Sequence, residues 1–502
     1  MRKKAVAILF LLLFLCYKTG RTQEMLGVTL GNYSGVSSIL VNPAMIANTK
    51  YYLDINLVSV DGFLRNNFAY IPASDASIYS LLGNGDLPTY GPDNDKNFTY
   101  YPNKELKSAT LSAKVLGPSA MVQLGKHAFG LSTSAQVFSS GNRIPYEMPL
   151  FGYYGMDESS LQNINYIDYD IDASAAAWMN AGLSYAYVAY ERFDQKITVG
   201  ATIKYVWSYA GIYMESSNAN YIVLNDSTIN IKNLNGSAGY ALPVDYADSD
   251  QIVDEPLFKG RGFGFDLGVV YVKKKTVDSE RWNRLCSQEF DDYVYRIGVS
   301  ILDLGSMNYK NNAELHDYEN VAVYWQNYDT TSFTNIDQLT SDLSNLFYGD
   351  PNASYAGNKI IIGLPTAVSV QADYNIYKNF YAAGYWIHPI RFNSHTLRRP
   401  SQIAIVPRYE SKYFEVNLPI SVYEYKYPRV GLSARFWFFT IGTERLGTWL
   451  GISNLDGLDI YASIKFGFGK GDCRIRFKSA CNDDNSLNKK KKRNNFNKNI
   501  VF

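Results

Sequence analysis

Apolar and polar side chains alternate along many short stretches of this chain. The clearest run is 458–468, and similar runs lie at 197–207 and 263–271. Because successive side chains of a strand point to opposite faces, a period of two predicts β-strands with one apolar face each. About fifteen such segments recur, and each approaches the roughly 9–11 residues that a tilted strand needs to cross a membrane. The others lie at 52–60, 109–115, 119–124, 129–137, 181–190, 293–301, 321–326, 368–376, 380–388, 402–410, 414–422 and 430–438.

The polar face of these segments distinguishes a membrane barrel from a soluble β-sandwich, which also alternates. Gly, Ser, Thr, Asn, Gln and Tyr dominate that face, and 19% of the chain is charged, against roughly 25% in an average soluble domain. Aromatic residues make up 15% of the chain, and several lie near strand ends, where membrane barrels carry aromatic girdles. These pairs are Tyr205 and Trp207, Tyr381 and Trp386, Phe436 and Phe438, and Phe466 and Phe468. The sequence therefore predicts an all-β protein, a transmembrane antiparallel β-barrel of about 14 strands, closed so that no edge meets lipid.

The two ends of the chain carry signals of a different kind. Residues 1–22 combine a basic start with a short apolar stretch and predict a signal peptide. Residues 23–50 form an N-terminal plug or cap, 51–470 the outer-membrane barrel, and 471–502 a basic polar tail that we expect to be solvated in the periplasm. The expected location is the cell outer membrane, with the lipid bilayer and the barrel-assembly machinery as partners.

The connections between strands predict two different rims. Tight turns at 124–129 and 193–196 contrast with long polar connections at 73–107, 140–178, 216–258 and 306–358. Short turns at one end and long loops at the other are typical of outer-membrane barrels. Within the last connection, 335–347 has apolar residues on one helical face and predicts a helix that packs on the loops.

Four sequence motifs, taken in order, resemble a known group of membrane barrels. They are SSILVNPAMIANTKYYLDINL at 37–57, LGPSAM at 116–121, GRGFGFDLGVVY at 260–271 and LPTA at 364–367. The set resembles an uncharacterised family of barrels of Gram-negative bacteria. That family is similar to the FadL-type hydrophobic-compound transporters and related to the PorV component of type IX secretion. The resemblance implies an N-terminal plug inside the barrel, and either transport of a small hydrophobic compound or docking of a secretion-system partner protein.

The residues of the first motif form a local structure of their own. Asn42 can cap a helical turn, Pro43 suits its first position, and Ala44 continues it. A turn of this composition fits a plug in the lumen and a cap on the periplasmic rim equally well. We therefore expect Asn42, Pro43 and Ala44 to form a turn and leave its place open.

No motif of a known reaction appears in the sequence. The four histidines lack metal-ligand spacing, and there is no G-x-S-x-G elbow. We expect no enzyme activity, no cofactor and no metal, and the net charge of +1 argues against a nucleic-acid partner. A disulfide between Cys473 and Cys481 is one reading of the tail, and free thiols are the other.

Charged residues at polar-face positions are candidates for the interior of the barrel. Asp266 and Asp373 are expected to face the lumen, where they could pair with Arg296 or Arg435. Three functions stay open: a channel for a small hydrophobic compound, a structural or secretion-associated barrel that docks a partner, and a soluble secreted β-rich protein that binds a surface. An apolar lumen favours the first, and a filled polar lumen with ordered aromatic loops favours the second.

Overall fold

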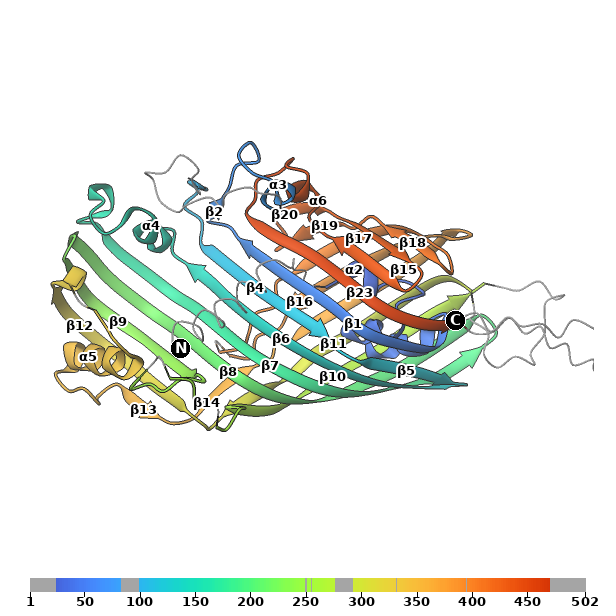
Figure 1. Ribbon diagram of the computed structural model, residues 1–502, viewed down its shortest axis with the longest axis horizontal. Coiled ribbons are helices and arrows are strands. Elements are labelled where there is room, and N and C mark those ends of the chain that lie inside the picture. The colour runs from blue at the N-terminus through green and yellow to red at the C-terminus, as the bar shows by residue number, and fades with distance from the viewer. Residues whose placement is uncertain are drawn as a thin grey trace, which may run out of the picture.

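The strands close into one antiparallel barrel, because β23 (Gly457–Gly469) pairs back onto β1 (Tyr51–Asn66) (Figure 1). The predicted all-β fold with about 14 strands is confirmed. The computed structural model describes residues 24–82, 99–248, 251–253, 255–275, 292–330, 332–393 and 395–469. The expected signal peptide, the basic tail, and Cys473 with Cys481 lie outside the described residues.

Ten wall strands are continuous and four are interrupted. The continuous strands are β1, β6 (His127–Ile144), β7 (Asn165–Arg192), β8 (Gln195–Asn225), β10 (Gly260–Lys274), β11 (Tyr293–Tyr309), β16 (Phe380–Pro389), β17 (Gln402–Glu410), β22 (Phe439–Thr443) and β23. The interrupted strands are β4 (Lys107–Leu116) with β5 (Ser119–Leu124), β14 (Ile360–Gly363) with β15 (Ala367–Tyr377), β18 (Phe414–Asn417) with β19 (Ile420–Tyr423), and β20 (Tyr427–Val430) with β21 (Leu432–Phe436). Three breaks contain Pro118, Pro365 or Pro419, since proline has no N–H for the ladder.

The two ends of the barrel differ in the length of their connections, as the sequence predicted. At the turn rim, where β1 begins and β23 ends, β5 meets β6 and β7 meets β8 through two-residue turns at 125–126 and 193–194. At the opposite loop rim, β7 and β8 continue as a pair far past the other strands. There β8 pairs with β9 (Thr228–Ala241), which pairs with β12 (Ala313–Gln326). The connections expected at 140–178, 216–258 and 306–358 are therefore wrong in large part, because strands occupy much of each.

The remaining elements are short and lie mostly at the loop rim and inside the barrel. The predicted helix is confirmed as α5 (Ile336–Tyr348), which packs against β12. The others are α2 (Leu26–Thr29), η1 (Gly35–Leu40), η2 (Pro43–Asn48), β2 (Ala69–Tyr70), α3 (Ile78–Leu82), β3 (Thr99–Tyr100), α4 (Glu147–Tyr154), η3 (Ser159–Leu161), η5 (Tyr328–Thr330), β13 (Tyr355–Gly357) and α6 (Leu446–Trp449). Among the described residues, no helix combines the length and apolarity needed to cross a bilayer.

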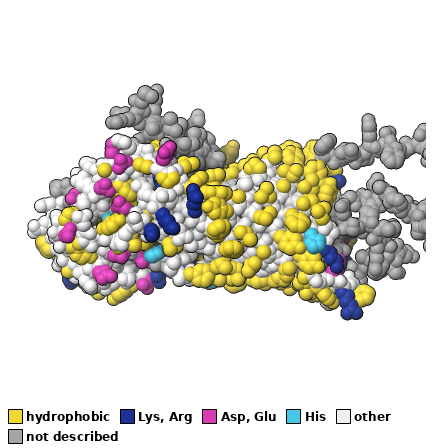
Figure 2. Space-filling model, turned by 90° about the horizontal axis from the view of Figure 1, so that it is seen from below, with side chains coloured by type: hydrophobic (Ala, Val, Ile, Leu, Met, Phe, Trp, Pro, Cys, Tyr) yellow, Lys and Arg dark blue, Asp and Glu magenta, His cyan; other side chains and the backbone are white. Residues whose placement is uncertain are grey.

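An apolar belt surrounds the barrel nearer the turn rim (Figure 2). One row of it runs across β6, β7, β8 and β10 in direct register, and its exposed members are Leu131, Leu183, Ile203 and Phe265. In Figure 2 the Lys, Arg, Asp and Glu side chains gather mainly beyond this belt. Tyr205 and Trp207 meet edge to face at its loop-rim side. Tyr381 was expected in the same girdle, and the structure corrects this. Its side chain is buried among Tyr293 and Arg408 inside the barrel.

The N-terminal lumenal segment, residues 24–50, fills the barrel at its turn-rim half (Figure 1). Its short helices α2, η1 and η2 contact inward positions of the wall strands. Its side chains are buried except those of Tyr33, Leu40 and Lys50, which are half-buried. The chain then enters the wall directly at Tyr51.

Candidate lumenal site

The inward side chains of β8 show that the lumen is built in layers. Going from the turn rim to the loop rim, Gly200 touches the N-terminal lumenal segment and Lys204 lies among carboxylates. Val206 and Tyr213 belong to an apolar cluster, and Glu215 lines an acidic cavity. Because inward residues of a strand recur at every second position, successive inward residues of β8 lie about 6.6 Å apart. The layers are called the lower, ionic, apolar and acidic layers below.

In the lower layer, the turn of the lumenal segment rests on glycines of the wall. Asn42 caps η2 by accepting a hydrogen bond from the Ala44 backbone N–H at 2.9 Å. The Asn42 amide also donates to the Gln371 side chain at 3.0 Å. A β-carbon at Gly268 would overlap Asn42 Oδ1, and one at Gly200 would lie 2.5 Å from the Ala44 nitrogen. The structure thus places Asn42, Pro43 and Ala44 inside the barrel, where only glycine leaves room for them.

The ionic layer joins the wall, the lumenal segment and a loop that folds inward. This inward loop, residues 390–393 and 395–401, connects β16 to β17. Its Arg399 pairs with Glu24 of the lumenal segment at 3.0 Å and with Asp303 of β11 at 3.5 Å. Lys204 pairs with Asp303 at 2.6 Å and with Asp266 at 2.8 Å. Asp266 therefore faces the lumen, and its partner is Lys204 rather than an arginine.

A second ionic cluster lies nearer the turn rim. Asp373 accepts from Arg296 at 2.9 Å and from Arg408 at 2.7 Å. Arg296 also donates to the Asn48 carbonyl at 3.1 Å, which fastens the end of the lumenal segment to β11. Arg435 pairs with Glu415 at 3.1 Å rather than with either aspartate. All four sequence-selected charges are buried, and of the pairs expected among them only Arg296 with Asp373 forms.

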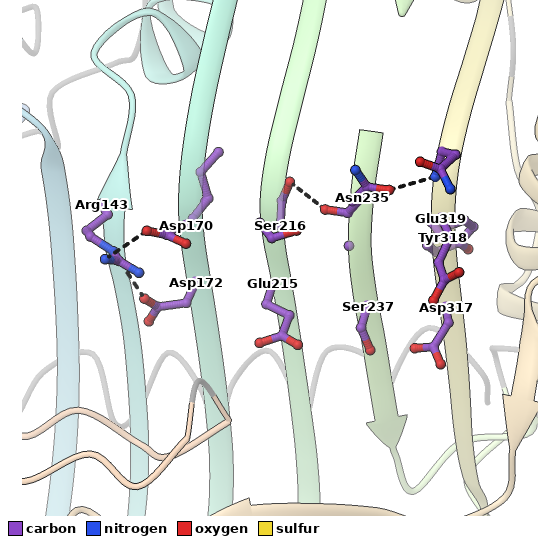
Figure 3. Close-up of a pocket in the computed structure, with 14 residues that line it drawn as sticks. Arg143, Asp170, Asp172, Glu215, Ser216, Asn235, Ser237, Asp317, Tyr318 and Glu319 are labelled. Atoms are coloured by element: carbon purple, nitrogen blue, oxygen red, sulfur yellow. Dashed lines mark hydrogen bonds and ion pairs between the residues drawn. The ribbon is translucent and has the colours of Figure 1, made fainter. Parts of the chain in front are cut away.

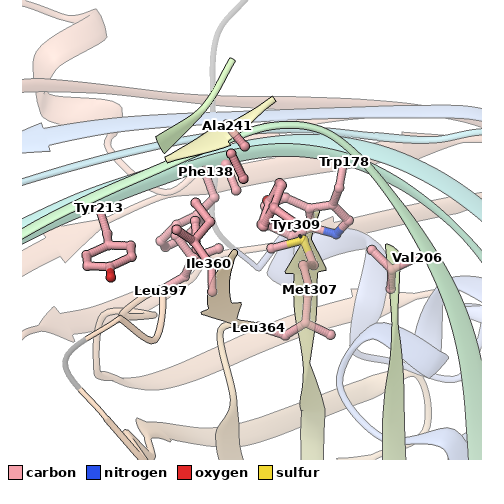
Figure 4. Packing of buried hydrophobic residues seen from close by; sticks show 13 residues of the cluster. Phe138, Trp178, Val206, Tyr213, Ala241, Met307, Tyr309, Ile360, Leu364 and Leu397 are labelled. Carbon is pink, nitrogen blue, oxygen red and sulfur yellow. Dashed lines mark hydrogen bonds between the residues drawn. The ribbon is translucent and has the colours of Figure 1, made fainter. Parts of the chain in front are cut away.

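The apolar layer closes the lumen above the ionic layer (Figure 4). Inward side chains of β6, β7, β8, β11 and β14 meet there, together with Leu397 of the inward loop. The members with large side chains are Phe138, Trp178, Val206, Tyr213, Met307, Tyr309, Ile360, Ile362, Leu364 and Leu397. Leu397 comes from a loop and not from the wall, so a movement of the inward loop would open this layer.

The acidic layer forms a cavity of about 620 Å³ at the loop rim (Figure 3). Its lining contains the carboxylates of Asp170, Asp172, Glu215, Asp317 and Glu319, with Arg143 on one side. The inward loop is tied to this wall, because Arg391 pairs with Asp172 and His395 with Glu215, both at 3.0 Å. The His395 ring also stacks on Tyr213, with centroids 3.9 Å apart. Excess negative charge at an entrance favours cations and neutral molecules over anions.

Within the described ranges, no three His, Cys, Asp or Glu residues come together in a way that could hold a metal ion. Sequence reasoning missed Glu24, Lys204, Asp303, Arg399 and Arg408, which complete the two ionic clusters. Lys204 was detectable, because it occupies a polar-face position of a clearly alternating segment. Glu24 and Arg399 lie outside the strands and carried no such signal.

Comparisons with known proteins give a family and a set of structural neighbours. The family of unknown function DUF5723 matches residues 43–444. A Pseudomonas aeruginosa FadL homologue aligns at TM-score 0.38 and 11% identity, covering 90% of this chain and 99% of its own. The Pseudomonas putida toluene transporter TodX aligns at TM-score 0.28 and 11% identity, covering 90% and 99%. A deltaS2S3 mutant of the TodX monoaromatic hydrocarbon channel aligns at TM-score 0.41 and 10% identity, covering 90% and 100%. No curated protein matches the chain.

Proposed function

Since the chain belongs to DUF5723, a family of unknown function, we propose its role from the lumen itself: an outer-membrane channel for small, neutral or cationic hydrophobic compounds, closed here by its N-terminal lumenal segment and its inward loop. The apolar layer carries this proposal. It lies in the lumen between the ionic layer and the acidic layer and is lined by aromatic and aliphatic side chains. Such a lining binds apolar molecules once a closure moves.

The location in the outer membrane is supported by the belt on the barrel wall. A closed barrel with outward Leu, Ile, Val and Phe in register satisfies its backbone in lipid, and the same surface in water would be a large exposed apolar patch. Between the exposed Val199 and the Tyr205–Trp207 pair, β8 has the length expected of a membrane-crossing strand.

The two ends of the lumen support passage through it. The acidic cavity opens at the loop rim, and a second cavity of about 740 Å³ opens at the turn rim beside Lys50 and Tyr381. The lumenal segment between them is held by hydrogen bonds and ion pairs and also by apolar contacts with the wall, since its residues belong to four of the buried apolar clusters.

A reversible lock on the lumenal segment tests the proposal. The four natural cysteines are first replaced by serine, and Gly27→Cys is then combined with Ser433→Cys. The added β-carbon at Gly27 lies 2.6 Å from the Ser433 β-carbon, and a shift of about 1 Å gives the spacing of a disulfide. The measurement is uptake of the apolar dye N-phenylnaphthylamine by cells that display the protein. We expect uptake in the reduced state, and a rate equal to that of cells without the protein in the oxidised state.

A second cysteine pair provides the control, because it bridges two parts of the wall. Gly117→Cys with Thr133→Cys has β-carbons 3.9 Å apart and leaves the lumenal segment free. Oxidation of this pair should not change uptake. Equal uptake in the oxidised and reduced Gly27–Ser433 protein would show that the segment is not the closure, and no uptake in either state would refute the channel.

A docking barrel, the PorV-like alternative, is favoured by one further observation. Above the belt, β7, β8, β9 and β12 form an ordered sheet that exposes Ile167, Tyr169 and Tyr324. Such a sheet is larger than closure of the barrel requires and offers aromatic anchors to a partner protein. Substitution of these three residues by serine should abolish partner cross-linking without changing dye uptake if docking is the role of the sheet.

A further inference from the structure

Three arginines are buried together on the side of the lumen opposite β8. Arg65 lies on β1, Arg429 on β20, and Arg445 just before α6, and each is more than nine-tenths buried. Arg65 and Arg445 each pair with one oxygen of the same carboxylate, Asp456. Asp459 and Glu444 are the other acidic groups that act on Arg429. Glu444 also accepts a hydrogen bond from the Leu26 backbone N–H of the lumenal segment at 3.2 Å, whereas the three arginines belong to none of the layers that close the proposed channel.

Several N–H groups of this arginine cluster lack acceptors. Arg65 Nε, Arg429 Nε, Arg429 Nη2 and Arg445 Nη1 are buried without a hydrogen-bond partner. Arg429 has no carboxylate partner of its own, and its guanidinium carbon instead lies 3.9 Å from the Tyr423 ring centroid and 5.2 Å from that of Phe63. Aromatic rings cover the face of a guanidinium group, so the N–H groups at its edge still need hydrogen-bond acceptors. A buried charged donor without an acceptor is costly, so such groups point to a missing polar partner.

The cluster lies behind a break in the barrel wall. β20 pairs with β19 on one side, and β23 pairs with β1 from Gly457 onward. The strand between them, β22, ends at Thr443, and in this fully described stretch no strand links β20 to the start of β23. The strap formed by residues 444–456, which contains α6, covers the break. Its Leu450 and Ile452 are exposed apolar side chains on the outside.

We propose that the arginine cluster binds a phosphate-type oxyanion, which reaches it through the wall break when residues 446–455 of the strap move while Arg445 and Asp456 stay in place. Four unmatched donor nitrogens exceed what the two oxygens of a carboxylate accept in one bidentate contact, whereas a phosphate offers three or four oxygens. The acidic cavity repels anions from the lumen entrance, so the wall break is the favourable route. The phosphate comes either from solution or from the head group of a membrane amphiphile.

Binding of phosphate to the detergent-solubilised full chain tests this site. The probe is radiolabelled inorganic phosphate in equilibrium dialysis, with chloride holding the ionic strength constant. We expect one saturable site in the wild type and at least about tenfold weaker binding in Arg429→Met, since a hydrogen bond to a charged group contributes at least this factor. Arg435→Met is the matched control and should bind as the wild type does, because Arg435 is paired with Glu415 in the other part of the lumen.

The source of the phosphate is distinguished in nanodiscs. If phosphatidic acid remains bound in native mass spectrometry and phosphatidylcholine does not, the source is a membrane amphiphile. If only inorganic phosphate binds, the source is a soluble ion. If neither phosphate source binds the wild type, the proposal is overturned.

A measurement on the wild type covers the case in which Arg429→Met does not fold. Phosphate should slow phenylglyoxal modification of Arg65, Arg429 and Arg445 and leave that of Arg435 unchanged. Equal protection of all four arginines would also overturn the site. These outcomes do not depend on dye uptake, so failure here leaves the proposed channel standing.

Discussion

At the scale of single residues, Gly268 shows how the wall accommodates the lumenal segment. A side chain there would overlap the Asn42 cap, so Gly268→Ala must push the turn of the segment off β10. Overpacking of this kind costs about 1–3 kcal/mol. We expect a lower midpoint temperature for the shift in gel mobility that accompanies unfolding of the barrel, and faster proteolysis within residues 24–50.

Gly384 provides the matched control on another strand, β16. A β-carbon there lies 3.9 Å from its nearest neighbours, which belong to Ala372. Gly384→Ala should therefore leave the midpoint unchanged within about 0.5 kcal/mol. If the two variants behave alike, the Asn42 turn is not held by the space at Gly268.

Inward and outward positions were predictable from the sequence, whereas the partners of inward residues were not. Alternation placed Asp266 and Arg435 on the polar face, which the structure buries. Their partners Lys204 and Glu415 lie on the directly paired strands β8 and β18, and many other combinations of inward residues fit the same pattern. Tyr381 was misplaced because an aromatic side chain suits an interface and a packed interior equally well.

At the scale of elements, the β9–β12 pair above the belt is held by a buried polar contact that responds to pH. Glu314 of β12 accepts hydrogen bonds from Tyr240 at 2.7 Å and from His316 at 3.3 Å. The bond from His316 lowers the pKa of Glu314 below its ordinary value of 4.5. A carboxyl group whose pKa is lower in the folded than in the unfolded protein stabilises the fold at pH values above its unfolded pKa. This stabilisation is lost as the pH falls through the pKa of the folded protein.

Hydrogen exchange of β9 and β12, measured relative to intrinsic rates, should therefore accelerate as the pH falls below about 4.5 and through the lowered pKa of Glu314. The variant Glu314→Gln should lack most of this pH dependence while keeping the contact to Tyr240. Acceleration of equal size in the variant would assign the effect to other carboxyls.

These same elements mark the limit of sequence reasoning at this scale. Strands inside the belt have one face toward lipid and one toward the lumen, so they alternate clearly. Above the belt both faces of β8, β9 and β12 meet water or loops, so the alternation fades and the sequence resembles a polar loop. For this reason, parts of the connections expected at 216–258 and 306–358 are strands.

At the scale of the whole molecule, the barrel is a tube closed by contacts of different kinds at different heights. Ion pairs, hydrogen bonds and apolar clusters with the wall hold the lumenal segment. The inward loop contributes Arg399, Leu397 and His395 to three successive layers. A movement of this one loop would therefore change the ionic, apolar and acidic layers together. The side chains of the belt would not take part in this movement, because they occupy the outward positions of the strands and the lumenal contacts are made by the alternate, inward positions.

The belt makes a prediction that separates lipid from water along a single strand. Leu183 and Tyr169 both point outward from β7 and are 65% and 61% exposed, but Leu183 lies in the belt and Tyr169 in the sheet above it. In a bilayer, Leu183→Arg should destabilise folding by about 2–4 kcal/mol, while Tyr169→Arg should cost about 0–1 kcal/mol. Urea titration of folding into phosphatidylcholine vesicles measures both. Equal costs would mean that the belt does not face lipid, and the surface of this barrel would then have to be explained by a protein partner.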